Sequence, residues 1–323
     1  MKKALITGIN GQDGSYLAEF LVEKGYEVHG TLKRNSIPEN QTARIQHIYP
    51  QIKNNLYHAD MCDMSSLLSV VKKARPTEIY NLAAQSHVRV SFDQPIYTMD
   101  TIARGTLNLL EVVRLTGIPT KIYQASSSEM FGNTVDSDGF QRETTPMNPV
   151  SPYACAKLMA FNLIRCYRES YDIFGTNGIL FNHESPRRGG NFVTNKIVMG
   201  AVKIKKGLAS ELALGNLEST RDWGHAKDYV KVMWQLLQLD EPGDYVCATG
   251  ISHSVREFCE QTFSKLGMDY RDYVIQDSKF FRPNELHDLK GDTKKLASVI
   301  NLNFEYTFDI MIDEMINHWM ERL

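Results

Sequence analysis

Cysteine is scarce in this chain, and its cysteines are scattered. Five occur in 323 residues, none in C-x-x-C spacing, at Cys62, Cys155, Cys166, Cys247 and Cys259. An odd number of separated thiols favours free cysteines in a reducing compartment over a disulfide framework. Histidines with metal-ligand spacing are also missing, and lone ones such as His87, His183 and His225 are more often structural groups. We therefore expect a cytoplasmic protein without a metal site.

Long apolar runs and an excess of one charge are missing too. No stretch reaches the roughly eighteen apolar residues of a membrane-spanning helix, and the N-terminus enters a strand pattern without the shape of a signal peptide. The 36 basic and 38 acidic residues give a formal net charge of -2. This balance argues against nucleic acid or an anionic membrane surface as a partner. A chain of 323 residues can bury a large core in one to three domains.

Glycines are present where a nucleotide-binding turn needs them. A short apolar run ends at Gly8, and an amphipathic helix pattern follows over 15–24. Gly8 permits a tight turn, Gly11 lets the backbone approach a pyrophosphate, and Gly14 lets helix and strand pack closely. The positive N-terminal end of the helix favours phosphate. We predict a dinucleotide-binding turn, rather than an ordinary glycine turn, made by Thr7, Gly8, Gly11, Gln12, Asp13 and Gly14.

The end of the next predicted strand, 27–32, lacks the acidic residue that normally holds the ribose 2′-hydroxyl of NAD. It continues Lys33-Arg34-Asn35-Ser36, whose cations and small polar groups suit a 2′-phosphate, so we predict NADP bound by Arg34, Asn35 and Ser36. A solvated loop is the alternative for the two cations. Asp60 and Met61 are expected to face the adenine. A later strand end is expected to line the cofactor with Leu82, Ala83, Ala84 and Ser86.

Strand-like and helical stretches alternate up to about residue 180, as in 78–83, 105–116 and 121–125. This alternation predicts an α/β fold with a Rossmann-type doubly wound parallel sheet. We expect 1–180 to form the NADP-binding domain, with parts of 220–250 returning to it. The shorter elements of 181–323 include a loop over 182–190 and end in a helix near 311–322. They are expected to form mainly a smaller substrate-binding α/β lobe at the carboxyl edge of the sheet.

Tyr153 and Lys157 are four residues apart, so on a helix they lie on one face. An ammonium group there is expected to lower the pKa of the phenol and favour a tyrosinate that takes a proton from a sugar hydroxyl. Upstream, a predicted strand continues into Ser127, Ser128 and Glu129. The Ser127 hydroxyl can share the substrate oxygen with Tyr153, and Glu129 offers a carboxylate for a second proton transfer beside a new ketone. A serine-rich turn with a solvated glutamate is the alternative.

Several longer runs carry a resemblance to one enzyme family. They are 4–8 with 11–21, 78–82, 178–189, 221–230, and 281–283 followed by 291–292. In these runs the sequence resembles the extended short-chain dehydrogenases/reductases, and among them the GDP-mannose 4,6-dehydratase family. The runs 178–189 and 221–230 are the ones that separate GDP-sugar dehydratases from relatives acting on UDP- or dTDP-sugars.

The resemblance implies redox-neutral loss of water from a GDP-hexose, with GDP-mannose as the first candidate. Tyr153, supported by Lys157 and Ser127, would take the proton of the C4 hydroxyl while hydride passes to NADP. Glu129 would remove the C5 proton as water leaves C6, and the hydride would return to C6. Ser128 or Glu129 would protonate the leaving hydroxyl, and no metal is needed.

The resemblance also implies binding residues and an assembly. His183 and Arg188 join the cofactor site, which Tyr153 and Lys157 also contact. The GDP-sugar would be held by Ser86, Glu129, Asn182, Val193, Lys196, Gly215, Arg221, Arg282 and Glu285. Arginine and lysine suit the diphosphate charge. A homodimer or homotetramer is implied, in which the apolar faces of 105–116 and 151–169 would pair between subunits; core packing is the alternative for these faces.

The chain departs from the family pattern at several positions. Ser127 stands where the family usually has threonine, and Asn195 replaces an arginine, which would remove a cation near the nucleotide. Gly190 occupies a position that often carries a larger or acidic residue beside the sugar, so a bulkier C2 substituent could fit. The run 267–279 is short, and 34–36 departs from an Arg-Arg-Ser loop that brings subunits together in tetrameric members.

Three other functions stay open on the sequence. GDP-N-acetylglucosamine is an alternative substrate for the same dehydration. A GDP-sugar epimerase or reductase would keep Tyr153 and Lys157 but would not need Glu129 as a base. A non-enzymatic NADP-binding regulator would have no reason to assemble these three with Ser127. The hexose, the choice between dimer and tetramer, the acid for C6 and the downstream pathway are not determined by the sequence.

Overall fold

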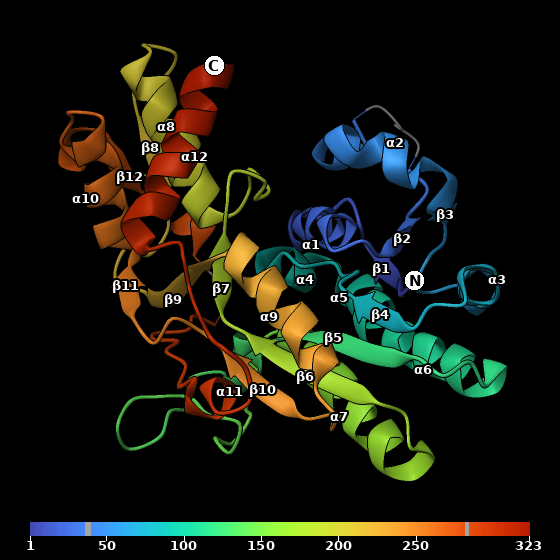
Figure 1. Cartoon of the computed structure of the whole chain (residues 1–323). Coiled ribbons are helices and arrows are strands. Elements are labelled where there is room, and N and C mark those ends of the chain that lie inside the picture. The colour runs from blue at the N-terminus through green and yellow to red at the C-terminus, as the bar shows by residue number, and fades with distance from the viewer. Residues whose placement is uncertain (36–39, 282–283) are drawn as a thin grey trace.

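The computed structural model describes residues 1–35, 40–281 and 284–323. A parallel sheet of seven strands runs through the molecule in the order β10-β6-β5-β4-β1-β2-β3 (Figure 1). Its strands are β1 (Lys3–Thr7), β2 (Glu27–Leu32), β3 (Leu56–His58), β4 (Glu78–Asn81), β5 (Lys121–Ser127), β6 (Gly175–Leu180) and β10 (Asp244–Cys247). The strand order reverses between β1 and β4, and ligands of doubly wound sheets bind at such a point. The predicted fold class is confirmed.

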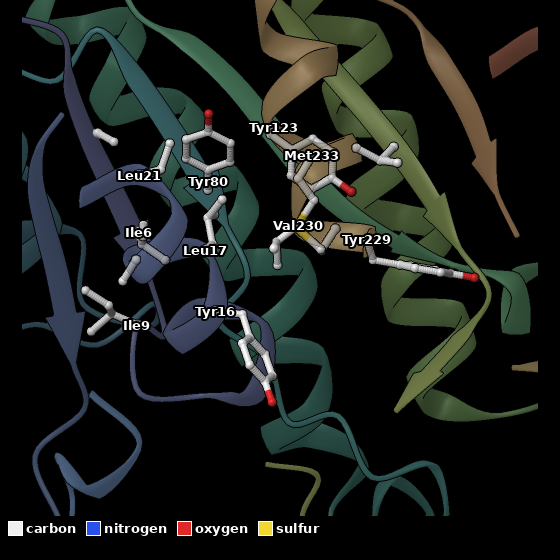
Figure 2. Packing of buried hydrophobic residues seen from close by; sticks show 14 of the residues in the cluster. Ile6, Ile9, Tyr16, Leu17, Leu21, Tyr80, Tyr123, Tyr229, Val230 and Met233 are labelled. Atoms are coloured by element: carbon white, nitrogen blue, oxygen red, sulfur yellow. The ribbon is translucent and has the colours of Figure 1, made fainter. Parts of the chain in front are cut away.

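Alternate side chains of the central strands pack on opposite faces of this sheet. Ile6, Tyr80 and Tyr123 contact the helices of one face, whereas their neighbours Leu5 and Ile79 belong to the core of the other face. The first face is covered by α1 (Gln12–Glu23) and α9 (Ala226–Gln238), and Figure 2 shows their side chains against the strands. The second face is covered by α3 (Met64–Ala74), α6 (Gly105–Thr116) and α7 (Pro152–Tyr171). Both cores are buried, as a sheet covered on its two faces requires.

Short elements connect these helices and strands. They are a 3-10 turn at Ala43–Ile48 (η1), α2 (Tyr49–Ile52), α4 (Val88–Asp93), α5 (Pro95–Met99), a π-helical segment at Asp100–Arg104, and a 3-10 turn at Ser128–Phe131. The π segment joins α5 to α6, so the helix predicted at 105–116 continues a longer helical run. Helix α1 begins at Gln12 rather than near residue 15, which brings its first turn next to the glycines.

A smaller lobe stands beside the main sheet and carries the C-terminus (Figure 1). It contains the strands β7 (Asn182–Glu184), β8 (Leu212–Leu214), β9 (Thr220–His225), β11 (Ser252–Ser254) and β12 (Val274–Gln276). Its helices are α8 (Val193–Lys205), α10 (Val255–Lys265) and α12 (Phe308–Arg322). These helices share one apolar core, which includes Phe258, Trp223 and Ile312. The stretch 182–190, predicted as a loop, thus begins with a strand.

The chain returns to the main sheet twice after entering the lobe. First, α9 packs beside α1, and β10 adds to the edge of the sheet at β6. Later, α11 (Lys294–Ala297) lies against β10, and Leu296 and Phe304 pack on the core under α1 and α9. The sheet and the lobe are therefore built from interleaved parts of the sequence. Within the described ranges, no helix is both long and apolar enough to cross a membrane.

Candidate active site

A cavity of about 1060 Å³ opens between the carboxyl ends of the main-sheet strands and the smaller lobe. Its wall includes the glycine turn after β1, the ends of β4 and β5, one face of α7, and the residues that follow β6. On the lobe side it is lined by the first turn of α8 and by Gly215 and Phe280. Pockets for one small ligand occupy about 300–1,000 Å³, so this cavity is slightly larger than the largest of them.

The glycine turn leaves little space for any side chain. Gly8 has a φ of +69°, and a Cβ on Gly14 would lie 2.3 Å from the Gly8 carbonyl oxygen. The Gly11 amide donates to the same carbonyl over 2.9 Å, which closes the turn. Gly11 is also the N-cap of α1 and has no side-chain cap, so the first amides of this helix lack a side-chain partner there. A close backbone approach at a helix N-terminus fits the diphosphate of a dinucleotide.

Most predicted cofactor residues line the cavity. They are Gly8, Gly11, Gln12, Asp13, Gly14, Asp60, Met61, Leu82, Ala83, Ala84, Ser86, Tyr153, Lys157, His183 and Arg188. Thr7 does not line the cavity. Its hydroxyl is buried beneath the turn, donates to Asn81 Oδ1 over 2.8 Å, and accepts the backbone amides of Leu82 and Ala83. Thr7 therefore shapes the wall without forming it.

The end of β2 differs in detail from the prediction. Lys33, rather than Arg34 or Asn35, belongs to the cavity wall, and its Nζ lies 3.1 Å from a carboxylate oxygen of Asp60. The Arg34 guanidinium turns back to the carbonyl of Asn35 over 3.0 Å. Ser36, the third predicted phosphate ligand, lies outside the described residues.

Three cavity-lining arginines, Arg44, Arg89 and Arg187, were missed as site residues. Arg44, in η1, donates to the carbonyl of Asn10 in the glycine turn over 3.2 Å. Arg187 stacks 3.9 Å from the ring centroid of Tyr16 on α1. Arg44 carries no sequence signal, since only folding brings η1 to the turn. Arg187 lies in the run 178–189 that carried the resemblance, so its position could have been proposed.

His183 is held as a cation inside the cavity wall. Its Nδ1 lies 2.8 Å from the carbonyl oxygen of Phe181, and its Nε2 lies 2.8 Å from Asp13 Oδ2. Both partners accept hydrogen bonds, so both ring nitrogens carry protons. Burial acts to lower the pKa of His183, but the Asp13 carboxylate outweighs it and raises that pKa. Burial acts to raise the pKa of Asp13, and His183 outweighs it, lowering the pKa to about 2.

The predicted catalytic side chains converge at the end of β5. Ser127, Ser128 and Glu129 follow one another there, and Tyr153 and Lys157 face them from the first turns of α7. All five are less than one-tenth exposed. The Ser127 hydroxyl accepts the Glu129 amide over 3.3 Å, which orients this short turn. Helix α7 starts sharply because the Ser151 hydroxyl accepts the amide of residue 154 and Pro152 occupies its first turn.

The electrostatics of Tyr153 differ from the prediction. Burial raises the pKa of the phenol to about 12, although a hydrogen bond with Ser127 and the charge of Arg188 both act to lower it. Lys157 was expected to give the phenol a lowered pKa. The pKa is raised instead, so that expectation is wrong. The Lys157 ammonium donates to the carbonyl of Ala125 over 2.7 Å, and burial lowers the pKa of Lys157 to about 8.

The predicted substrate residues that the structure describes line the cavity, most of them on the lobe side. Ser86, Glu129, Asn182, Val193, Lys196, Gly215, Arg221 and Glu285 line it, and Arg282 lies outside the described residues. Lys196 Nζ sits 3.4 Å from the ring centroid of Phe280 and donates to the carbonyl of Ala213. Arg221 donates to the carbonyl of Leu286 over 3.1 Å. Cations and an aromatic ring here suit a nucleoside diphosphate.

The two departures near the sugar have different outcomes. Gly190 lines the cavity, and a Cβ on it would meet only Met199 Cε, at 3.9 Å, so this wall is open as expected. Asn195 lies outside the cavity wall, is buried, and donates to the Arg188 carbonyl over 2.6 Å. Its Oδ1 accepts the Trp319 indole, also over 2.6 Å. Asn195 therefore links α12 to the stretch before α8 rather than lining the cavity.

The fold and the cavity together define a class of protein. A doubly wound sheet with a glycine turn, joined by a serine, a tyrosine and a lysine at one strand end, is the arrangement of a short-chain dehydrogenase/reductase. Within this class, residues 5–315 match the family model of GDP-mannose 4,6 dehydratase. The chain belongs to the GDP-mannose 4,6 dehydratase family. No group of three or more potential metal-ligating side chains occurs among the residues described.

Individual relatives agree with this placement. The chain is 51% identical over 327 residues to GDP-mannose 4,6 dehydratase 2 of Arabidopsis thaliana, covering 97% of this chain and 86% of that protein. It is 48% identical over 339 residues to GDP-mannose 4,6 dehydratase of Homo sapiens, covering 97% and 90%. A dTDP-glucose 4,6-dehydratase structure from Streptomyces venezuelae, solved with NAD and TYD, superposes with a TM-score of 0.87 at 22% identity, covering 99% and 97%. This last likeness concerns the fold.

Proposed function

We propose that this chain is a hydro-lyase that converts GDP-mannose to GDP-4-keto-6-deoxymannose and water. The observation that carries the proposal is the buried group of Ser127, Glu129, Tyr153 and Lys157, which opens on the same cavity as the dinucleotide turn. Family membership supplies the substrate, since the relatives described above are named for GDP-mannose. The cavity reaches from the dinucleotide turn to the lobe residues proposed for the nucleotide sugar.

Tyr153 is the proposed base for the C4 hydroxyl. A dinucleotide held at the glycine turn would supply the hydride acceptor for C4 and the hydride donor for C6. Tyr153 takes the C4 hydroxyl proton, and the Ser127 hydroxyl stabilises the phenolate through the hydrogen bond that acts to lower the phenol pKa. Arg188 adds positive charge near the phenolate. Lys157 holds its ammonium within the same buried site.

Glu129 is the proposed base for C5. The C4 ketone acidifies the neighbouring C5 proton, and the Glu129 carboxylate removes it while the C6 hydroxyl leaves as water. The leaving oxygen needs a proton, which Ser128 or the newly protonated Glu129 supplies. C5 regains a proton when hydride adds to C6, and the proton that Tyr153 took from the C4 hydroxyl balances it. A plain alcohol oxidation at C4 needs no second base. The carboxylate at this place therefore favours a reaction that includes elimination.

The substrate alternative is less well supported. The open wall at Gly190 would accommodate an N-acetyl group at C2. The relatives at 48–51% identity are nevertheless GDP-mannose dehydratases, so GDP-N-acetylglucosamine is not favoured. A pure epimerase or reductase is likewise not favoured, because the matching family is a dehydratase family.

The proposed cofactor is NADP rather than NAD. Lys33, at the end of β2, lies 3.1 Å from the carboxylate of Asp60, which follows β3, and so neutralises its charge. Arg44 adds a further cation at the glycine turn. A 2′-phosphate gains from these charges, whereas NAD would need a carboxylate free to accept its 2′-hydroxyl. Isothermal titration should give a lower Kd for NADP than for NAD, and equal constants would contradict the choice.

A homodimer is the proposed assembly. Helices α6 and α7 lie side by side, and α7 exposes Met159 together with Cys155 and Cys166. Leu115 of α6, in the same layer of helices, is exposed as well. Pairing of these helices between two subunits would cover the apolar side chains. Light scattering that gives the mass of one chain would contradict this assembly.

Mass spectrometry of the reaction tests the proposed function. Purified enzyme with GDP-mannose should yield a product lighter by one water, and GDP-N-acetylglucosamine should be turned over less. Glu129→Gln should slow water loss by about 100-fold or more, since a positioned base contributes that much. Absorbance of reduced nicotinamide should still report C4 oxidation in this variant. Glu169→Gln, at an exposed position of α7, is the control and should behave as the wild type.

Two results would contradict this assignment. Unchanged water loss in Glu129→Gln would remove the proposed base. Intact dinucleotide binding without turnover of either GDP-sugar would revive a regulatory role.

A further inference from the structure

Glu19, on α1, is a charged residue that the chemistry above does not use. Its carboxylate oxygen Oε1 contacts Arg187 Nη2 over 2.5 Å and also contacts His47 Nε2. Arg187 belongs to the stretch after β7, and His47 belongs to η1. The carboxylate therefore joins three segments that are far apart in the sequence: α1, η1 and residues 185–188.

Arg187 is held against α1 by more than this ion pair. Its Nη1 donates to the Ser15 hydroxyl over 3.1 Å, and its guanidinium lies 3.9 Å from the ring centroid of Tyr16. Nearby, the Gln12 side chain donates to the His183 carbonyl and accepts the Ser185 hydroxyl. The first two turns of α1 thus dock the stretch after β7 through side chains as well as through packing.

The docked segments bring three guanidinium groups to one wall of the cavity, those of Arg44, Arg187 and Arg188. Burial lowers the pKa of Arg44, and the charges of Arg187 and Arg188 lower it further. Arg188 is balanced by Glu184, 3.0 Å away, and Arg187 by Glu19. Like charges at this spacing repel one another, so the cluster needs counter-charges to stay assembled.

We propose that Glu19 is a positioning residue for cofactor binding: it holds Arg187 and η1 against α1, so that Arg44, Arg187 and Arg188 face the dinucleotide phosphates. The inference rests on the proposed dinucleotide site. Glu19 itself is not part of the cavity wall. Its effect is therefore exerted through the arginines.

Titration of NADP and of GDP into Glu19→Gln tests the proposal. The glutamine keeps the size of the side chain but removes the charge. We expect the Kd for NADP to rise about tenfold, which is within the range of coupling between residues of one ion-pair network. The Kd for GDP should stay within about twofold, because its proposed site at Lys196 and Phe280 is formed by other segments. The control is Glu23→Gln, an exposed position one turn further along α1, which should bind both ligands as the wild type does.

The outcomes separate this inference from the proposed function. Wild-type protein that binds no dinucleotide would refute both. Wild-type binding with an unchanged NADP Kd in Glu19→Gln, or with equal weakening of NADP and GDP, would refute the positioning role alone.

A second variant guards against misfolding of the first. Because Glu19 acts partly through Arg187, Glu19→Gln combined with Arg187→Gln should lose less NADP affinity than the sum of the two single losses. Additive losses would contradict the proposal. Should Glu19→Gln fail to fold, Glu19→Asp replaces it, because its shorter side chain keeps the charge. In this variant the Kd for NADP should rise relative to the wild type by more than the Kd for GDP does. A full wild-type NADP affinity in that variant would equally contradict it.

Discussion

Gly14 and Gly190 both line the cavity, but they leave different room for a side chain. A Cβ on Gly14 would lie 2.3 Å from a backbone oxygen, whereas one on Gly190 would meet only a methionine methyl group at 3.9 Å. Gly14→Ala should therefore abolish dinucleotide binding or folding, as measured by titration and by thermal unfolding. Gly190→Ala should change stability by no more than about 0.5 kcal/mol. A tolerated alanine at 14 would contradict the turn geometry.

The Asp13–His183 ion pair makes stability depend on pH. The pKa of His183 is raised in the folded state, so its contribution is present below the unfolded value of 6.5 and is lost as pH rises through the folded value. The pKa of Asp13 is lowered to about 2, so its contribution is present above 3.8 and is lost as pH falls towards 2. The pair thus stabilises the fold most strongly between these limits.

Asp13→Asn should reveal this window. Thermal unfolding of wild type and variant should differ most near pH 5–6, and the difference should shrink as pH rises above the folded pKa of His183. The same unfolding difference at every pH would show that the ring is neutral throughout.

At the scale of elements, α8 and α12 are joined by a buried amide. Asn195 donates to the Arg188 carbonyl and accepts the Trp319 indole, and it is 1% exposed. Asn195→Ala would leave a carbonyl and an N–H without this partner, so we expect a loss of about 2 kcal/mol in unfolding free energy by denaturant titration. Lys206→Met removes another α8–α12 hydrogen bond, which is exposed, and should cost less than about 1 kcal/mol. Equal losses would show that Asn195 has no special role.

Elements were predictable from the sequence where the signals are local. The strand at 27–32 and the helix at 105–116 have the predicted bounds, because alternating apolar residues and a following Gly117 with positive φ mark them. The strand β7 was missed because Asn182-His183-Glu184 is short and polar. It is a strand because it pairs with β9, some forty residues later in the chain.

The site, like the elements, was predictable only where the signals are local in the sequence. The glycine turn and the residues at the end of β5 follow from motifs whose members are near in sequence. Arg44, the indirect role of Thr7 and the true partner of Asn195 depend on contacts between distant segments. The raised pKa of Tyr153 follows from burial, which spacing on a helix does not report.

For the whole molecule, the interleaving of sheet and lobe predicts one cooperative unit. Helix α12 of the lobe is tied to the start of α9 through Glu314, whose carboxylate lies 2.7 Å from both His225 Nε2 and Lys227 Nζ. Calorimetry should show a single unfolding transition, and NADP should move it to a higher temperature. At an NADP concentration a hundredfold above Kd, the free energy of unfolding should rise by about 2.7 kcal/mol. Two transitions, only one of them moved by NADP, would mean that the lobe unfolds by itself.

The place of β10 at the sheet edge has a consequence for synthesis of the chain. β6 ends at Leu180, but its outer neighbour begins only at Asp244, after much of the lobe. A ribosome adding about 5–20 residues per second leaves the hydrogen-bonding groups of β6 uncovered for several seconds. Such an open strand can pair with another nascent chain. A fragment released before β10 is made should therefore need chaperones to remain dispersed.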